Sequence, residues 1–279
     1  MKVGVGLPSC VPGCSPDVLV DWARAAEAGP FASLGTVDRV RYGNYEPLVA
    51  LSAAAAVTSR IQLATSILIS PLRETTTLAK QIASLDALAG GRLVLGVAVG
   101  ARRDDYDEGE HPYEERGRRL DDQLRAFREV WEDPAVGPRV DGRDRPTVLV
   151  GGSSGPAMAR MAREGDGFVH AGGPPRAFAR AADQARAAWA DLGRPGEPQL
   201  WGMAYFALGD AADRGREYLR DYYAFTGHFA ERIAEGLLDT PLAVRELVEG
   251  YADAGCDHLI LFPAVADRDQ IDRLADCLG

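Results

Sequence analysis

A glycine- and serine-rich turn, GGSSG at residues 151–155, is the stretch whose composition most directly predicts binding chemistry. It follows a short apolar segment, 147–150, and precedes a segment with helical spacing that begins at Ala157. Backbone N–H groups and hydroxyls at the start of a helix attract anions, because the helix dipole places partial positive charge there. A candidate anion site is therefore formed by Gly151, Gly152, Ser153, Ser154 and Gly155. The alternative is a plain strand-to-helix turn.

Four further residues carry titratable or charged groups at positions where strands are expected to end. Asp38 and Arg39 follow the apolar segment 31–37, His111 lies in the loop after the segment 93–99, and His170 ends the segment 167–170. Either histidine could act as a general acid or base, although a lone histidine is more often a hydrogen-bonded structural residue. An arginine holds an anion but cannot serve as a base near neutral pH. A surface salt bridge between Asp38 and Arg39 is the alternative for that pair.

The elements that must position these groups are clearest in residues 61–106. Residues 61–69 and 93–99 are continuous apolar runs that favour buried strands, and residues 75–88 carry leucine and isoleucine at helical spacing. Two parallel strands joined by a helix form one βαβ unit, whose ligands bind at the carboxyl ends of the strands. This unit therefore brings residues 66–73 to the same rim as residues 100–107, which include Gly100 and Arg102.

The whole chain repeats this alternation and predicts a single (β/α)₈ barrel domain over residues 1–279. Eight strands are expected at residues 2–6, 31–37, 61–69, 93–99, 147–150, 167–170, 200–208 and 258–262, with helices between them and after the last. A length of 279 residues suits this fold, which typically needs ~250 residues. Residues 133–146 are the most loop-like, but they are too short to separate two domains.

Charge and cysteine content exclude several classes of function. The net charge is −10 and no basic stripe is present, so neither nucleic acid nor an anionic membrane is an expected partner. No apolar run reaches the ~20 residues of a membrane-spanning helix, and no signal-peptide pattern is seen, which favours a cytoplasmic enzyme. The spacing of the histidines and of the four cysteines matches no common metal site. Cys10 and Cys14 are expected to be ordinary thiols near the pocket.

Four segments together give the chain a resemblance to a known family. They are residues 46–66, residues 79–100, residues 148–162 with Asp166–Phe168, and residues 240–258. In this order they resemble the bacterial-luciferase-like superfamily of flavin- and deazaflavin-dependent oxidoreductases. The resemblance implies a (β/α)₈ barrel, in agreement with the strand count. This chain is shorter than many members, so their variable insertions are expected to be trimmed.

The resemblance also implies roles for particular residues. The turn at residues 151–155 corresponds to the family's cofactor-phosphate site, and the Ser66–Ile67 bond to a non-prolyl cis peptide that supports the cofactor ring. Members commonly place a histidine where this chain has Asp38 and Arg39. Luciferases also place a phosphate-contacting arginine where this chain has Val99. Arg102 or Arg103 from the following loop is the candidate replacement, and a solvated charge cluster with Asp104 and Asp105 is the alternative.

The expected function is that of a luciferase-like oxidoreductase or monooxygenase that transfers hydride or activates O₂ through non-covalently bound FMN or coenzyme F420. The aromatic residues between positions 205 and 229 favour an apolar or aromatic small-molecule substrate. Helices at 50–57 and 75–88 resemble the family's homodimer face. A non-catalytic flavin-binding relative is the main alternative. A cofactor-independent lyase or aldolase ranks last, because the one lysine in the barrel region, Lys80, falls on a helix away from the rim.

Overall fold

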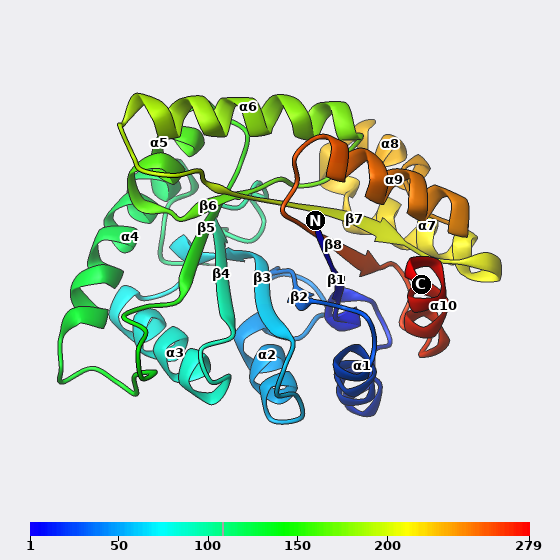
Figure 1. Ribbon diagram of the computed structural model, residues 1–279, viewed down its shortest axis with the longest axis horizontal. Helices are drawn as coiled ribbons and strands as arrows, with labels where there is room; N and C mark the ends of the chain where they lie inside the picture. Colours follow the sequence, from blue (N-terminus) through cyan, green and yellow to red (C-terminus); the bar gives the residue numbers. More distant parts are fainter. Residues whose placement is uncertain (108) are drawn as a thin grey trace.

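The computed structural model describes residues 1–107 and 109–279, and within them eight parallel strands close into a barrel surrounded by helices (Figure 1). Each strand pairs with the next along the chain, and β8 pairs with β1 to close the ring. The strands are β1 (Lys2–Gly6), β2 (Ser33–Thr36), β3 (Gln62–Ile69), β4 (Leu93–Ala98), β5 (Thr147–Gly151), β6 (Gly167–Val169), β7 (Gln199–Phe206) and β8 (His258–Pro263). The predicted fold class is confirmed.

The helices follow the strands as the apolar spacing predicts. They are α1 (Pro16–Ala28), α2 (Pro47–Ala55), α3 (Thr75–Leu88), α4 (Arg116–Glu132), α5 (Gly155–Glu164), α6 (Pro175–Asp191), α7 (Ala212–Tyr222), α8 (Phe229–Glu235), α9 (Pro241–Asp253) and α10 (Asp269–Leu278). Ser15 caps α1 and Thr240 caps α9, each accepting a hydrogen bond from a backbone N–H three residues on. Proline at the first helical position follows both caps and costs no hydrogen bond there.

Two parts of the helical layer contain 3₁₀ turns. The short 3₁₀-helix η5 (Ala224–Thr226) and Gly227, with φ +59°, separate α7 from α8. A 3₁₀ turn at Tyr113–Glu115 precedes α4, which becomes α-helical at Arg116. The strand ends differ from the expected ones by a residue or two.

Side chains of alternate strand residues fill two separate layers. The barrel interior holds one buried cluster, which includes Ala64, Val94, Leu149, Val169 and Ile260. A second, larger cluster fills the layer between the barrel and its helices. Because successive strand residues point to opposite faces, the position of a residue along its strand decides which layer it enters.

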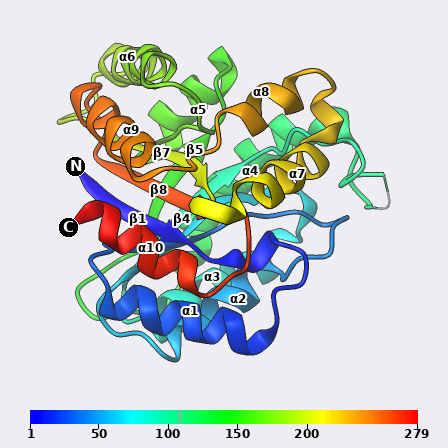
Figure 2. The ribbon, with the colours of Figure 1, turned by 90° about the vertical axis from the view of Figure 1, so that its right-hand side faces the viewer.

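The two ends of the barrel differ in what covers them. Figure 2 shows α7 and α8 beyond the ends of the β1 and β8 arrows, whereas both chain termini lie at the opposite end. We call residues 212–235, which comprise α7, η5 and α8, the cap segment. No helix in the described part of the chain is long and apolar enough to cross a membrane.

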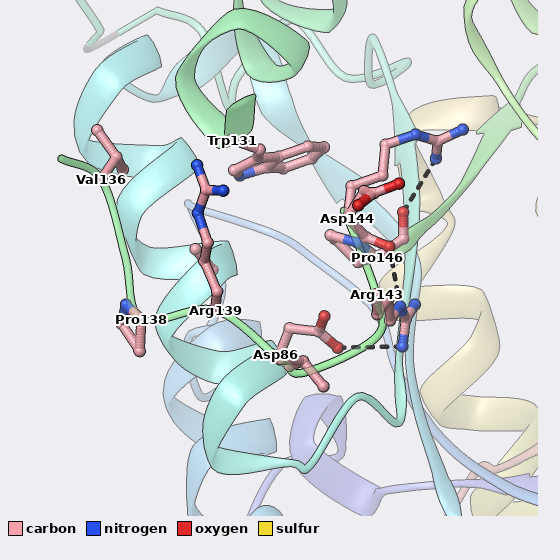
Figure 3. A pocket seen from close by; sticks show the side chains of 11 residues that line it. Asp86, Trp131, Val136, Pro138, Arg139, Arg143, Asp144 and Pro146 are labelled. Carbon is pink, nitrogen blue, oxygen red and sulfur yellow. Dashed lines mark hydrogen bonds and ion pairs between the residues drawn. The ribbon is translucent and has the colours of Figure 1, made fainter. Parts of the chain in front are cut away.

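The loop 133–146 packs against the side of the barrel near the amino ends of the strands (Figure 3). Arg143 donates to the carbonyl oxygens of Gly91 and, at 2.9 Å, Leu93, and it pairs with Asp86 at 3.4 Å. Lys80 on α3 donates to the carbonyl of Gly137 in the same loop. These contacts give the loop, the small cleft beside it and Lys80 a structural role, far from the carboxyl ends.

Candidate active site

A bulge near the end of β3 forms the floor of the candidate site. The pairing of β3 with β4 shifts between Thr65 and Leu68, and the Ser66–Ile67 peptide bond is cis, as predicted. The Ser66 hydroxyl is buried, and no described residue gives it a hydrogen-bond partner. Ile67 is half-buried against the interior cluster. The bulge thus presents an apolar side chain beside an unsatisfied hydroxyl.

Glycines on the neighbouring strands leave room for this bulge. A Cβ on Gly96 of β4 would overlap the carbonyl oxygen of Thr65, and a Cβ on Gly151 of β5 would come within 3.1 Å of Ile67 Cγ2. Gly100 follows β4 with φ +72°, and a side chain there would meet Ile69 at 2.8 Å. Gly100 therefore shapes the rim by being small.

The predicted glycine-rich turn lies at the end of β5. Gly152 has φ +115°, a conformation that favours glycine, and the Ser154 hydroxyl caps α5 by accepting from the N–H of Ala157 at 3.4 Å. Gly152, Ser153, Ser154 and Gly155 are all exposed at the start of this ten-residue helix. The turn therefore offers an accessible helix N-terminus at the carboxyl end, where an anion site is expected.

Asp38 does not pair with Arg39; it binds Arg73 instead. Its carboxylate accepts two hydrogen bonds from the Arg73 guanidinium, at 2.6 and 3.2 Å, and one from the Ile69 N–H at 2.8 Å. Burial raises the pKa of the Asp38 carboxyl, and the Arg73 charge opposes that shift. Arg73 also pairs with Glu46 at 2.8 Å. This network ties the end of β2 to the segment that follows the bulge.

Arg39 is buried at the mouth of the barrel, the part of its carboxyl end formed by Arg39, Tyr42, Arg102 and Tyr222. Its guanidinium donates to Asp104 at 3.0 Å, and its Nε lies 3.9 Å from Asp105. The guanidinium carbon is 4.8 Å from the centre of the Tyr42 ring and 5.5 Å from that of Tyr222. The alternative of a surface salt bridge with Asp38 is therefore excluded, and Arg39 is a buried cation held by acids from the loop after β4.

Arg102 binds the cap segment. Its guanidinium donates to the carbonyl of Tyr222 and lies 4.6 Å from that ring and 4.0 Å from the ring of Phe225. Burial lowers the pKa of Arg102. Arg103 is exposed and paired with Glu114 at 2.8 Å. Arg102 therefore fastens the cap segment over the mouth, and its predicted role at a cofactor phosphate has no support in these contacts.

Tyrosines of the cap segment and Cys10 complete the mouth, and they are the site residues that sequence reasoning left unassigned. The hydroxyls of Tyr205 and Tyr223 lie 2.8 Å apart, and Tyr222 packs edge-on against Tyr42. Burial raises the pKa of Tyr205 and Tyr222 well above the ordinary value, so both hydroxyls stay protonated. Burial also raises the pKa of the Cys10 thiol to about 12. The aromatic clustering at 205–229 was the available signal.

The structure does not bring the two candidate histidines to this mouth. The His170 ring packs against Phe168 of β6, 6.2 Å away, and Phe178 of α6, 5.8 Å away, which places it in the layer outside the barrel. Burial lowers the pKa of His170, so the ring is neutral there. His111 is half-buried in the loop before α4, and no contact among the described residues joins it to Arg39. The expectation that His170 faces the pocket is therefore wrong.

Fold and site together define a (β/α)₈ barrel whose carboxyl end carries a bulge with a cis peptide, a glycine-rich helix start and a buried arginine–tyrosine mouth. The family model "Luciferase-like monooxygenase" matches residues 1–269, and the chain belongs to that family. The predicted family resemblance is thereby confirmed.

Individual relatives are distant. An F420-dependent glucose-6-phosphate dehydrogenase from Gordonia bronchialis is 29% identical over 193 residues, which cover 60% of this chain and 56% of the relative. The match covers about two thirds or less of the length of these curated relatives.

Two solved structures share the fold over nearly the whole chain. The monooxygenase RslO1 from Streptomyces bottropensis has a TM-score of 0.82 and 21% identity, and covers 100% of this chain and 97% of its own. An F420-dependent secondary alcohol dehydrogenase in complex with an F420–acetone adduct has a TM-score of 0.81 and 15% identity. The match covers 99% of this chain and 97% of the dehydrogenase chain. At these identities the likeness concerns the fold alone.

Proposed function

We propose that this chain is an oxidoreductase that transfers hydride between a non-covalently bound deazaflavin, coenzyme F420, and a small apolar or aromatic organic substrate. The observation that carries the proposal is the buried, unpartnered Ser66 hydroxyl beside Ile67 at the carboxyl end of the barrel. A buried polar atom without a partner is costly, and a bound ligand that hydrogen-bonds to it removes that cost. The F420-dependent relatives support the choice of cofactor.

The residues present fit such a cofactor. Ile67 would support the ring, the Ser66 hydroxyl would hydrogen-bond to it, and the exposed turn at residues 151–155 would hold the phosphate. The bound cofactor supplies the hydride chemistry, and the protein supplies binding, orientation and charge. Arg39 lies at the same mouth, where Asp104 and Asp105 balance its charge.

Hydrogen bonds to the substrate at the mouth would come from tyrosine rather than from histidine. The paired hydroxyls of Tyr205 and Tyr223 stay protonated and can donate a hydrogen bond to an oxygen or nitrogen of the substrate. The cap segment excludes water from this region by its aromatic contacts with Arg39 and Arg102.

The test is a pair of fluorescence titrations with F420 and with FMN. We expect F420 to bind more tightly, and we expect Ser153→Glu to weaken it by about tenfold or more, because the new carboxylate repels the phosphate. Leu242→Glu is the matched control, since it adds the same charge at the exposed start of α9. Tight FMN binding with weak F420 binding would instead favour a reduced-flavin monooxygenase. Binding of neither cofactor would contradict the proposal and leave a non-catalytic relative.

We further propose a homodimer formed through α2 and α3. Val49 on α2 and Leu88 on α3 are 64% and 69% exposed, so these two helices of the face that the family resemblance assigns to the dimer offer apolar side chains to a partner. Sedimentation at micromolar concentration is expected to give the dimer mass, and Val49→Asp to shift it towards the monomer. A monomer in the unmutated protein would refute the dimer.

A further inference from the structure

A cavity of about 500 Å³ opens at the carboxyl rim beside the mouth. It is bounded by the loop after β1, by Tyr42 from the loop after β2, by α7 and by the loop after β8. Its volume suits one small organic molecule. The cavity lies at the carboxyl end, where barrel enzymes bind their ligands.

One side of the cavity is shared with the mouth. Tyr42 and Tyr218 line the cavity, and each also packs against Tyr222, with ring centres 5.2 and 5.5 Å apart. Tyr222 in turn lies against the guanidinium groups of Arg39 and Arg102. A molecule in the cavity is therefore separated from the buried arginines by one layer of tyrosine.

The remaining walls are largely apolar. Val11, Ala264 and Val265 are buried and line the cavity, and Ala266 lines it in a half-buried position. These side chains, with the two tyrosines, favour the hydrophobic or aromatic body of a ligand.

The charged groups of the cavity are mainly acidic. Asp221 and Glu217 both lie on the exposed side of α7, and Asp221 accepts a hydrogen bond from the Tyr42 hydroxyl at 2.7 Å. Within the described residues Glu217 has no ion-pair partner. The cation on this wall, Arg214, is already paired with Asp267. The lining therefore has an excess of negative charge.

We infer that the cavity binds an organic cation: an apolar or aromatic molecule with a protonated amine, placed between Asp221 and Glu217 with its body against Tyr42 and Tyr218. The cavity lining does not include Ser66, Ile67 or the turn at residues 151–155, so this is a second binding site beside the one of the proposed function. An anion would meet two like charges at this wall, and a neutral molecule would gain only the apolar contacts.

Three probes of nearly equal shape test the inference on the protein without any cofactor. Benzylamine, benzyl alcohol and benzoate are titrated by calorimetry and by saturation-transfer NMR. We expect benzylamine to bind best and benzoate worst, with benzylamine at least about threefold tighter than the alcohol, the effect of a partly screened charge pair. Added salt should weaken only the amine. Benzoate binding as tightly as benzylamine would overturn the inference.

Variants assign the binding to this cavity. Asp221→Asn keeps the acceptor for Tyr42 and Glu217→Gln keeps the shape; each should weaken benzylamine by about threefold to tenfold and leave benzyl alcohol unchanged. Asp213→Asn is the control, because Asp213 is an exposed acid of the same helix that pairs with Arg216 outside the cavity. Unchanged amine binding in both test variants would refute the cation site.

A cavity-filling variant keeps the test valid if the acidic variants fold poorly. Ala266→Leu adds bulk to the half-buried rim without changing charge, and it should weaken the amine and the alcohol alike. Retained binding of both probes would place the site elsewhere. Because no cofactor is present, failure here is separate from failure of the F420 titration, which tests the proposed function alone.

Discussion

Replacing Arg73 by methionine is the sharpest test of how the mouth is held together. Arg73 gives Asp38 two hydrogen bonds, at 2.6 and 3.2 Å, and the Asp38 side chain is only 1% exposed. Without Arg73, the carboxylate keeps one hydrogen-bond donor among the described residues, the Ile69 N–H at 2.8 Å. Removing one partner of a buried ion pair typically costs about 3–5 kcal/mol, and we expect this loss in the free energy of unfolding at pH 7.5.

The cost should shrink in acid. Burial already raises the pKa of Asp38 with Arg73 present, and in R73M the opposing charge is gone, so the pKa rises further. A carboxyl whose folded-state pKa lies above its unfolded value of about 3.9 destabilises the fold as pH rises through the folded pKa. Near pH 4 the group is largely protonated in the folded variant, and most of the penalty is absent.

Urea unfolding followed by circular dichroism measures both effects, and Asp38→Asn supplies the control. The asparagine carries no charge, so D38N should cost less than R73M, and the double variant should cost no more than R73M alone. The reasoning is refuted if R73M loses less than about 1 kcal/mol at pH 7.5, or if its loss is equal at pH 4 and pH 7.5.

Three other outcomes follow from local contacts. Burial favours the protonated form of Glu27, but four hydrogen bonds to its carboxylate lower the pKa to about 2. Urea unfolding of E27Q should therefore show the full loss of stability above pH 5, and the loss should vanish as the pH falls towards 2. A Cβ on Gly4 would overlap a buried serine hydroxyl whereas one on Gly43 meets open space, so G4A should lower the thermal midpoint by several degrees and G43A should leave it nearly unchanged. Burial raises the pKa of the Cys10 thiol to about 12 and that of the more exposed Cys14 thiol to about 11. A thiol reagent at pH 8 should therefore label Cys14 slowly and Cys10 only after unfolding. Labelling of folded C14S as fast as that of the unmutated protein would contradict this.

Local sequence patterns predicted the positions of the helices and strands well. The apolar spacing between Thr75 and Leu88 gave both ends of α3. The parallel strands read as apolar runs because both of their faces are buried. The cis bond at Ser66–Ile67 came from the family resemblance, since no propensity of those two residues indicates it.

The face that His170 occupies could not be predicted from the sequence. His170 lies two positions after Phe168, so both point to the same side, and the structure places Phe168 in the outer layer. Because strands of this kind are apolar on both faces, the sequence does not say which side Phe168 takes. The general expectation that the carboxyl end of a strand carries function does not state which side chains face the axis.

The contacts of the mouth depend on residues far apart in the sequence. Arg39 meets Asp104, 65 positions later, and Arg102 meets Tyr222, 120 positions later. Such pairs have no periodicity, because each joins loops from different strands whose relative placement is set by closure of the barrel. The sequence could therefore name the charged loops but not their partners.

The same contacts explain how the mouth can work without the family's usual histidine. A histidine in the place of Arg39 would change its charge near neutral pH, whereas Arg39 stays cationic and is anchored by Asp104 and Asp105. Burial keeps the hydroxyl of Tyr222 protonated over the same range. Protonated phenols are suited to donating hydrogen bonds, and Arg39 with its two acids holds them in place. In the proposed hydride transfer the mouth tyrosines would therefore bind the substrate by hydrogen bonds, and the accompanying proton would be exchanged with the bulk solvent rather than with a histidine.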